Sequence, residues 1–390
     1  MVDLHKGFEG FERLGPRSKK KKEEEEKEPR SEKAGEEKEI SLSKGAEKED
    51  ISLSKKEEVK EERKEDISLS KEAEEADLSL SQKSDLAKAE SVYDNILQYV
   101  TSVLNKVEAG KEDQIKGEEI LGKAGEFTDQ FLTSVNSDDL VRLIFQRDDY
   151  EDNYLYTHSV NVCLLSVRMA LALNFSKSKL TDLVIASLFH DIGMMKVPMD
   201  IWNHERPLRK REYIEVQKHV EYGERIFKKL SGINEAISSV IGQHQERCDG
   251  SGYPRGLTKE EIHYGARLIG LMDRYEANTH TRLFRPRMLP DKAIQQILDE
   301  ESHHFDNHFL KVMLRHISIF PIGAWVRISS GEVGNVIRVH ENVPMRPVLK
   351  VCYDREGNPL RESRLLDLSK QLLIHVECCI DIKELQKEEF

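Results

Sequence analysis

The sequence predicts a mainly α-helical protein that begins with a disordered tail and ends in a small β module. Three observations support this fold class: a highly charged N-terminal stretch, a long series of apolar residues at helical spacing, and a final stretch of short β-branched runs. The predicted segments are a disordered charged tail over 1–84, a helical N-terminal segment over 85–149, the main helical domain over 150–316, the β module over 317–378 and a C-terminal tail over 379–390.

The predicted N-terminal tail has the composition of a disordered segment. Residues 1–90 hold 21 Lys and Arg and 27 Asp and Glu, but no Trp, Tyr or Cys. Such a stretch cannot bury enough apolar surface to offset its chain entropy. Ile-Ser-Leu-Ser-Lys occurs at 40–44, 51–55 and 67–71, and Leu-Ser-Leu-Ser-Gln at 78–82. A solubilising linker and an array that is phosphorylated or docks a protein partner are both open interpretations.

Composition also excludes several classes of protein. The net charge of −12 argues against a nucleic-acid groove as the main function. No apolar run approaches the length of a bilayer span, and the N-terminus lacks a secretory apolar region. The five cysteines are scattered without a Cys-x-x-Cys pair, so neither a disulfide framework nor a zinc ribbon is expected. We expect a cytoplasmic protein without membrane or nucleic-acid partners; a homodimer remains open.

Apolar spacing places the elements that follow the tail. Helical spacing begins over 86–108 and continues to about residue 316, with breaks indicated by glycine, proline and the 248–257 loop. The residues at helical spacing in the first run are Leu86, Ala89, Val92, Ile96, Val100 and Val103. Strands are then predicted over Ala324–Ile328, Gly334–Val339 and Val348–Tyr353, which is typical of a small, barrel-like β module.

Several ionisable residues occupy positions that the apolar pattern assigns to the core. They are His158, His190, Asp191, His219, His244 and Asp273. One such histidine alone is more often a hydrogen-bonded core residue than a ligand. Burying several carboxylates without partners would cost several kcal/mol each, a penalty that bound metal ions remove. The six together therefore predict a metal site, and Asp191 is the natural bridging ligand because its two oxygens can bind two cations.

The same residues lie in a series of short motifs. In chain order these are His158-Ser159-x-Asn161-Val162, His190-Asp191-Ile192-Gly193, His219, His244-x-Glu246-x-x-Asp249-Gly250-Ser251-Gly252-Tyr253-Pro254 and Asp273-x-Tyr275-x-Ala277. An adjacent His-Asp pair alone is weak evidence, but the whole set in order is highly specific. It resembles the HD-GYP domain, a subgroup of the HD phosphohydrolases, over residues 150–316. The resemblance extends to a C-terminal β module found in some relatives.

This resemblance implies both a fold and an activity. It implies an HD-type helical bundle, a bacterial source, and hydrolysis of the messenger cyclic di-GMP, or a related cyclic dinucleotide, to pGpG or GMP. His158, His190, Asp191, His219, His244 and Asp273 take the metal-ligand positions, with His190 and Asp191 at the catalytic centre. Two divalent ions, iron or manganese, would activate a hydroxide for attack on phosphorus.

Four further residues are candidates for substrate binding. Arg282 and Arg285 lie where the family has an Arg-Pro-Tyr-Arg segment, and on a continuing helix both could reach one phosphate or a guanine edge. A solvated basic patch is the alternative. In the loop, Gly252 and Tyr253 line the substrate side; Tyr253 could stack on a base, or pack the loop onto the helical core.

Three positions depart from the family pattern. Gln245 replaces a second histidine and would offer only a weak oxygen ligand, and Met194 replaces a lysine that could neutralise phosphate. Tyr154 stands where relatives with three metals carry a glutamate, which favours two metals. The main hypothesis is a working phosphodiesterase. The alternatives are a catalytically weak or inactive cyclic di-GMP receptor or interaction module, and a hydrolase of another nucleotide.

Overall fold

The structure is a computed structural model that describes residues 85–133, 137–146, 154–202, 206–280, 287–340 and 342–382. The predicted tail over 1–84, with its Ser-Leu-Ser repeats, lies outside the described residues. No helix in the described ranges has the length and apolar character needed to cross a membrane.

The described chain is helical up to residue 316, as predicted. The first helix covers 85–108, and buried residues repeat along it at helical spacing. The helices that follow are α2 (Gly117–Thr133), α3 (Ser137–Gln146), α4 (Tyr154–Ala172), α5 (Lys177–Leu188), α6 (Met199–Trp202), α7 (Lys210–Gln217), α8 (His219–Lys228), α9 (Glu235–Ile241), α10 (Tyr264–Thr279), α11 (Pro290–Asp299) and α12 (Asn307–His316). Short 3₁₀ turns are η1 (Glu112–Gln114), η2 (Ile192–Lys196), η3 (Ser302–His304) and η4 (Leu368–Lys370).

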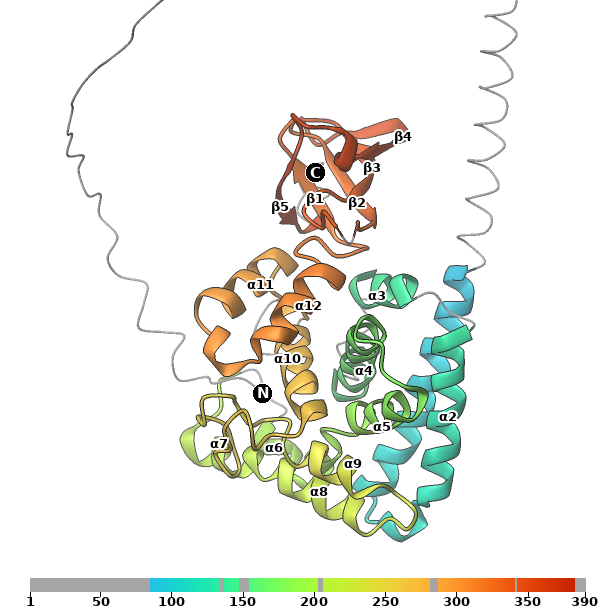
Figure 1. The fold of residues 1–390 in the computed structure, drawn as a ribbon, viewed down its shortest axis with the longest axis vertical. Helices are drawn as coiled ribbons and strands as arrows, with labels where there is room; N and C mark the ends of the chain where they lie inside the picture. The colour runs from blue at the N-terminus through green and yellow to red at the C-terminus, as the bar shows by residue number, and fades with distance from the viewer. Residues whose placement is uncertain are drawn as a thin grey trace, which may run out of the picture. The chain divides into compact units, whose positions relative to one another are not determined.

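One hydrophobic core runs through the helical part. It extends from Ala89 in the first helix to Ile317 after α12, so the segments predicted over 85–149 and 150–316 pack around the same interior. The helices α4 and α10 lie side by side near its centre, and α5 lies along α4 (Figure 1). Most residues of α4 and α10 are buried on every side, which explains why their sequences show almost no polar face. These buried helices carry part of the site described below.

The C-terminal part is a five-stranded antiparallel sheet with its own core. Its strands are β1 (Trp325–Ile328), β2 (Val333–Arg338), β3 (Val348–Tyr353), β4 (Pro359–Asp367) and β5 (Val376–Ile380), in the order β4-β3-β2-β1-β5. The mainly α fold class with a small β module is thus confirmed. The sequence pattern missed β4 because its side chains are almost all exposed, and β5 runs two residues beyond the predicted end at 378.

Candidate metal centre

Three histidines at helix ends present the same ring nitrogen to one point. In each, Nδ1 donates a hydrogen bond to the backbone carbonyl three residues earlier. These carbonyls lie at the ends of helices, where the last carbonyl groups lack the usual intrahelical N–H partner. The bonds join His190 to Ser187 at 2.8 Å, His219 to Val216 at 2.7 Å and His244 to Ile241 at 2.7 Å. A carbonyl only accepts, so Nδ1 carries the proton and Nε2 has a free lone pair. That is the tautomer a metal-binding imidazole requires.

The fourth histidine, His158 in α4, is oriented by a carboxylate instead. Its Nδ1 bonds Glu276 of α10, whose other oxygen accepts a 3.0 Å hydrogen bond from the Asn161 amide. Burial opposes ionisation of Glu276, but His158 and His280 outweigh it and lower the pKa of this carboxyl to about 2. Glu276 is therefore an anion in the core. A carboxylate behind an imidazole is the usual support for a histidine that binds metal.

The four Nε2 atoms surround the Asp191 carboxylate, and each of its two oxygens faces a different pair of histidines. Oδ1 of Asp191 lies 3.1 Å from His219 and 3.4 Å from His244. Oδ2 lies 3.8 Å from His158 and 3.7 Å from His190. Asp273 of α10 completes the second group, with Oδ1 3.2 Å from Nε2 of His158. We call these six residues, which the resemblance assigns to the metal-binding catalytic centre, the catalytic cluster. The structure brings together every metal ligand that the sequence predicted.

The cluster is buried, and its polar atoms are not satisfied by protein alone. All six residues are at most 6% exposed. Burial lowers the pKa of His190 to about 4, so its imidazole is neutral at neutral pH. Among the described residues, His190 Nε2 and Asp191 Oδ1 are buried without a hydrogen-bond partner. Imidazole and carboxylate atoms that lie a few ångströms apart without hydrogen-bond partners suit a divalent cation. Binding such a cation would offset the free-energy cost of burying them.

Close backbone packing brings these segments together. A side chain at Gly193 would place its Cβ 1.9 Å from the carbonyl oxygen of His219, and one at Gly252 would lie 2.3 Å from the backbone nitrogen of Arg247. Glycine is thus required by space at both positions. Gly252, predicted to bind substrate, lies against the backbone of Gln245 and Arg247, and its role toward substrate stays a prediction.

Gln245 does not present its carbonyl to the cluster, contrary to the sequence-based expectation of a weak oxygen ligand. Its Oε1 accepts a hydrogen bond from Nη2 of Arg247 at 3.1 Å, and its Nε2 donates to Oδ2 of Asp273 at 2.8 Å. A guanidinium only donates, which fixes the orientation of the amide. Gln245 is therefore a donor that orients Asp273.

Tyr253, Met194 and the neighbouring Lys196 lie in three different surroundings. Tyr253 packs edge-on against the ring of His219 at 6.4 Å, and its buried hydroxyl has no hydrogen-bond partner among the described residues. Met194 is fully buried in an apolar cluster with Leu155, Val197 and Val216. Lys196 bonds Glu112 and the carbonyl of Val107, away from the cluster.

Arg282 and Arg285 lie outside the described residues. The helix expected to continue into them ends earlier, because α10 stops at Thr279 and His280 is already extended. Tyr154, at the position of the third-metal glutamate, stacks on His158 with ring centroids 5.3 Å apart.

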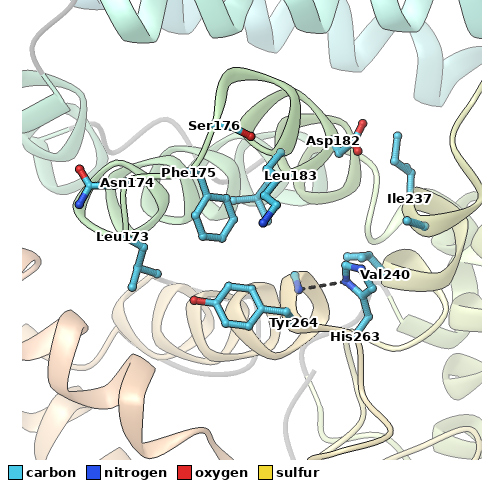
Figure 2. A pocket seen from close by; sticks show the side chains of 13 residues that line it. Leu173, Asn174, Phe175, Ser176, Asp182, Leu183, Ile237, Val240, His263 and Tyr264 are labelled. Atoms are coloured by element: carbon cyan, nitrogen blue, oxygen red, sulfur yellow. Dashed lines mark hydrogen bonds between the residues drawn. The ribbon is translucent and has the colours of Figure 1, made fainter.

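A separate cavity of about 680 Å³ lies between the end of α4, the start of α5, α9 and the start of α10 (Figure 2). Its lining is mostly apolar and includes Phe175, Leu183, Val240 and Tyr264. No residue of the catalytic cluster lines it, so the two sites are distinct.

Sequence reasoning assigned no role to the residues that support the cluster, although Asn161 and Glu246 stand in its motifs. Glu276 stands three residues after Asp273, on the same face of α10, and Asn161 stands three residues after His158 in α4. Glu246 accepts backbone N–H bonds from Arg255 at 2.8 Å and Leu257 at 2.9 Å, and so closes the loop. Glu276 and Asn161 could have been found from sequence, because each lies three residues after a cluster residue and so shares its buried helix face.

Comparison with known proteins agrees with this geometry. The HD domain family matches residues 147–309, the range that contains all six cluster residues. These residues belong to the HD domain family. A second match, to a KOW domain associated with the HD domain, covers residues 325–388 and hence the sheet that follows the HD domain.

Several curated proteins are similar to this chain at moderate identity. A cyclic di-GMP phosphodiesterase of Pseudomonas aeruginosa is 31% identical over 63% of this chain and 59% of its own length. The cyclic di-GMP phosphodiesterase PdeB of Borreliella burgdorferi is 25% identical over 56% of both chains. The 3′3′-cGAMP-specific phosphodiesterase 3 of Vibrio cholerae is 34% identical over 40% of this chain and 33% of its own. The chain thus spans less than two thirds of each relative.

Proposed function

We propose that this chain is a metal-dependent phosphodiesterase that hydrolyses a cyclic dinucleotide, with cyclic di-GMP as its substrate and pGpG or GMP as product. The observation that carries the proposal is the convergence of four oriented Nε2 atoms on two buried carboxylates. Relatives named as phosphodiesterases of cyclic di-GMP and of 3′3′-cGAMP support the substrate class.

The division of Asp191 between two groups supports a pair of divalent ions. One ion would be held by Asp191, His219 and His244, and the other by Asp191, His158, His190 and Asp273. Divalent ions in this place supply Lewis acidity toward phosphoryl oxygens and lower the pKa of water. Iron or manganese suits the mixed imidazole and carboxylate donors.

The chain's own residues would orient and shield the reaction. Glu276 and the three backbone carbonyls hold the imidazoles in one tautomer, and Gln245 holds Asp273. The buried Tyr253 hydroxyl would donate a hydrogen bond to a phosphoryl oxygen of the substrate, while its ring packs on His219. Arg282 and Arg285 are proposed to contact phosphate or guanine, as the family motif suggests.

The deciding experiment uses the full chain loaded with Mn²⁺ or Fe²⁺ under anaerobic, reducing conditions. Cyclic di-GMP and 3′3′-cGAMP are supplied in separate reactions, and pGpG, GMP and linear products are separated by chromatography. We expect hydrolysis of cyclic di-GMP, loss of turnover and of metal in His190→Ala, and full activity in His308→Ala, an exposed histidine outside the cluster. Binding of cyclic di-GMP by metal-loaded protein without product would instead identify a receptor.

Gln245→His tests the departure from the family pattern. An imidazole at this position adds a nitrogen donor beside Asp273, and we expect higher metal affinity and a higher rate. Met194→Lys is unsuitable as a companion, because Met194 is fully buried among apolar side chains and a lysine there would lack a partner.

A further inference from the structure

A second group of metal-binding side chains lies outside the catalytic cluster. Asp249 belongs to the loop that carries Tyr253, and His303 and His304 belong to η3. Each histidine places Nε2 3.7 Å from the same oxygen, Oδ2 of Asp249, and the centroids of the two imidazole rings are 4.2 Å apart. All three ligand atoms lie within 4.8 Å of one another. We call this group the peripheral cluster; it shares no residue with the catalytic cluster.

The Asp249 carboxylate is held in place by its own loop. Its Oδ1 accepts hydrogen bonds from the backbone N–H of Ser251 at 3.1 Å and from the Ser251 hydroxyl at 2.7 Å. That leaves Oδ2 to face the two imidazoles. Asp249 also forms an isolated antiparallel bridge with Thr258 across the loop. The carboxylate is thus aimed at the histidines by bonds in which they take no part.

The η3 turn is fixed just as firmly on its side. The carbonyl of His304 accepts a hydrogen bond from the backbone N–H of Cys248 at 2.8 Å. Glu301, just before η3, pairs with the buried Arg274 of α10, and the guanidinium of Arg247 lies 5.5 Å from the ring of Phe305, just after it. Two rigid segments therefore bring the three ligands together without help from an ion, which keeps the entropic cost of binding one low.

The distances suit a tetrahedral cation. Zinc bonds nitrogen and oxygen ligands at about 2.0–2.2 Å, so neighbouring ligand atoms in a tetrahedral site stand roughly 3.3–3.6 Å apart. The two 3.7 Å separations in the peripheral cluster are close to this value. One proton could serve only one of the two imidazoles, whereas a cation can bond both and the carboxylate at once. Two nitrogens and one oxygen favour zinc over manganese or magnesium.

We propose that Asp249, His303 and His304 form a second, peripheral Zn²⁺ site that ties the 248–258 loop to the segment preceding α12. The side chains of Asp249 and His303 are partly exposed, so water completes the coordination. Because Tyr253 and Gln245 belong to the same loop region, zinc at this site steadies the wall of the catalytic cluster from outside. The proposal does not depend on the proposed hydrolysis.

Zinc stoichiometry of the full chain tests the site. Chelator-stripped protein is titrated with Zn²⁺ against a chromophoric competitor, and the bound equivalents are compared between wild type, the His303→Ala/His304→Ala double variant and His308→Ala. We expect the double variant to bind one equivalent fewer than the other two proteins. Asp249→Asn, which keeps an acceptor for Ser251 but removes the charge, should lose the same equivalent. Equal stoichiometry in all four proteins would overturn the site.

Hydrogen exchange tests the tie to the loop. Zinc should slow exchange of the amides in 248–258 in wild type and in His308→Ala, and should leave the double variant unchanged. If wild type binds zinc but its amides in 248–258 exchange at the same rates as those of the double variant, the proposed link between the site and the loop is refuted. Neither readout uses hydrolysis, so failure here is distinguishable from failure of the phosphodiesterase proposal.

Discussion

Substituting Gly193 with alanine should damage the catalytic cluster without touching any ligand. The new Cβ would stand 1.9 Å from the carbonyl oxygen of His219 and 2.7 Å from the backbone nitrogen of Gly223. Cβ atoms in proteins essentially never come closer than 3.0 Å to such atoms. The backbone of η2 and that of α8 must therefore separate by about 1.1 Å, the difference between 3.0 and 1.9 Å.

A movement of that size exceeds what a metal site tolerates. His219 opens α8 and Asp191 directly precedes η2, so their 3.1 Å contact takes up the displacement. Metal-ligand distances hold within roughly 0.2 Å, and a misplacement of about 1 Å at a reaction centre costs on the order of 100-fold in rate. Overpacking of this kind also destabilises a fold by about 1–3 kcal/mol.

Three measurements follow Gly193→Ala: metal retained after dialysis, the rate of cyclic di-GMP hydrolysis, and the midpoint of urea unfolding. Gly122→Ala is the matched control, because Gly122 lies in α2 and its added Cβ would meet nothing within 4 Å. The control should gain up to about 1 kcal/mol from helix propensity. A folded Gly193→Ala protein with wild-type metal content and rate would refute the packing argument.

Three further outcomes are expected. Glu276→Gln keeps a hydrogen-bonding group behind His158 but removes the charge, and should weaken metal binding about 10–100-fold in a competition titration; unchanged affinity would contradict its supporting role. Tyr253→Phe removes a buried hydroxyl that has no hydrogen-bond partner among the described residues, so unfolding should be unaffected while kcat/KM falls; an unchanged kcat/KM would rule out the proposed phosphate contact. Burial opposes ionisation of Asp306, but its N-cap bond and its pairs with Lys259 and Arg267 depress the pKa of this carboxyl. Its stabilisation is therefore present above about pH 4 and lost as the pH falls through the depressed pKa, so Asp306→Asn should cost about 1 kcal/mol in urea unfolding at pH 7 and less in acid; an equal cost at both would contradict the linkage.

The six residues of the catalytic cluster were predictable from sequence because buried ionisable groups need a partner that neutralises them. A carboxylate such as Asp273, placed directly after a run of apolar residues on a helix with no solvent face, must be neutralised by something. The same reasoning applies to the imidazoles at the ends of α5 and α9, and all six predicted residues lie in one cluster. Helical spacing also located the first helix, and short runs of β-branched residues between turns located three of the five strands.

The supporting residues were not predictable in the same way. Glu276 has the residue type of an ordinary solvated helix position, and only the packing of α10 against α4 reveals that it is fully buried behind His158. The β4 strand gave no signal, because an edge strand with exposed side chains lacks the alternation that marks a half-buried strand. The peripheral cluster depends on the contact between Asp249 and His303, which are 54 positions apart in the chain. The spacing of residues along the sequence does not predict such a contact.

Gln245 shows how a partner outside the motif changes the meaning of a substitution. By sequence it is a lost ligand, since an amide oxygen binds metal less well than an imidazole. In the structure Arg247 occupies that oxygen, which turns the amide nitrogen toward Asp273. A carboxylate that accepts such a bond is fixed in orientation and keeps its charge for a cation. Replacing the family's histidine with Gln245 therefore removes one possible metal ligand and adds a group that positions another, Asp273. This replacement is compatible with a working two-metal site.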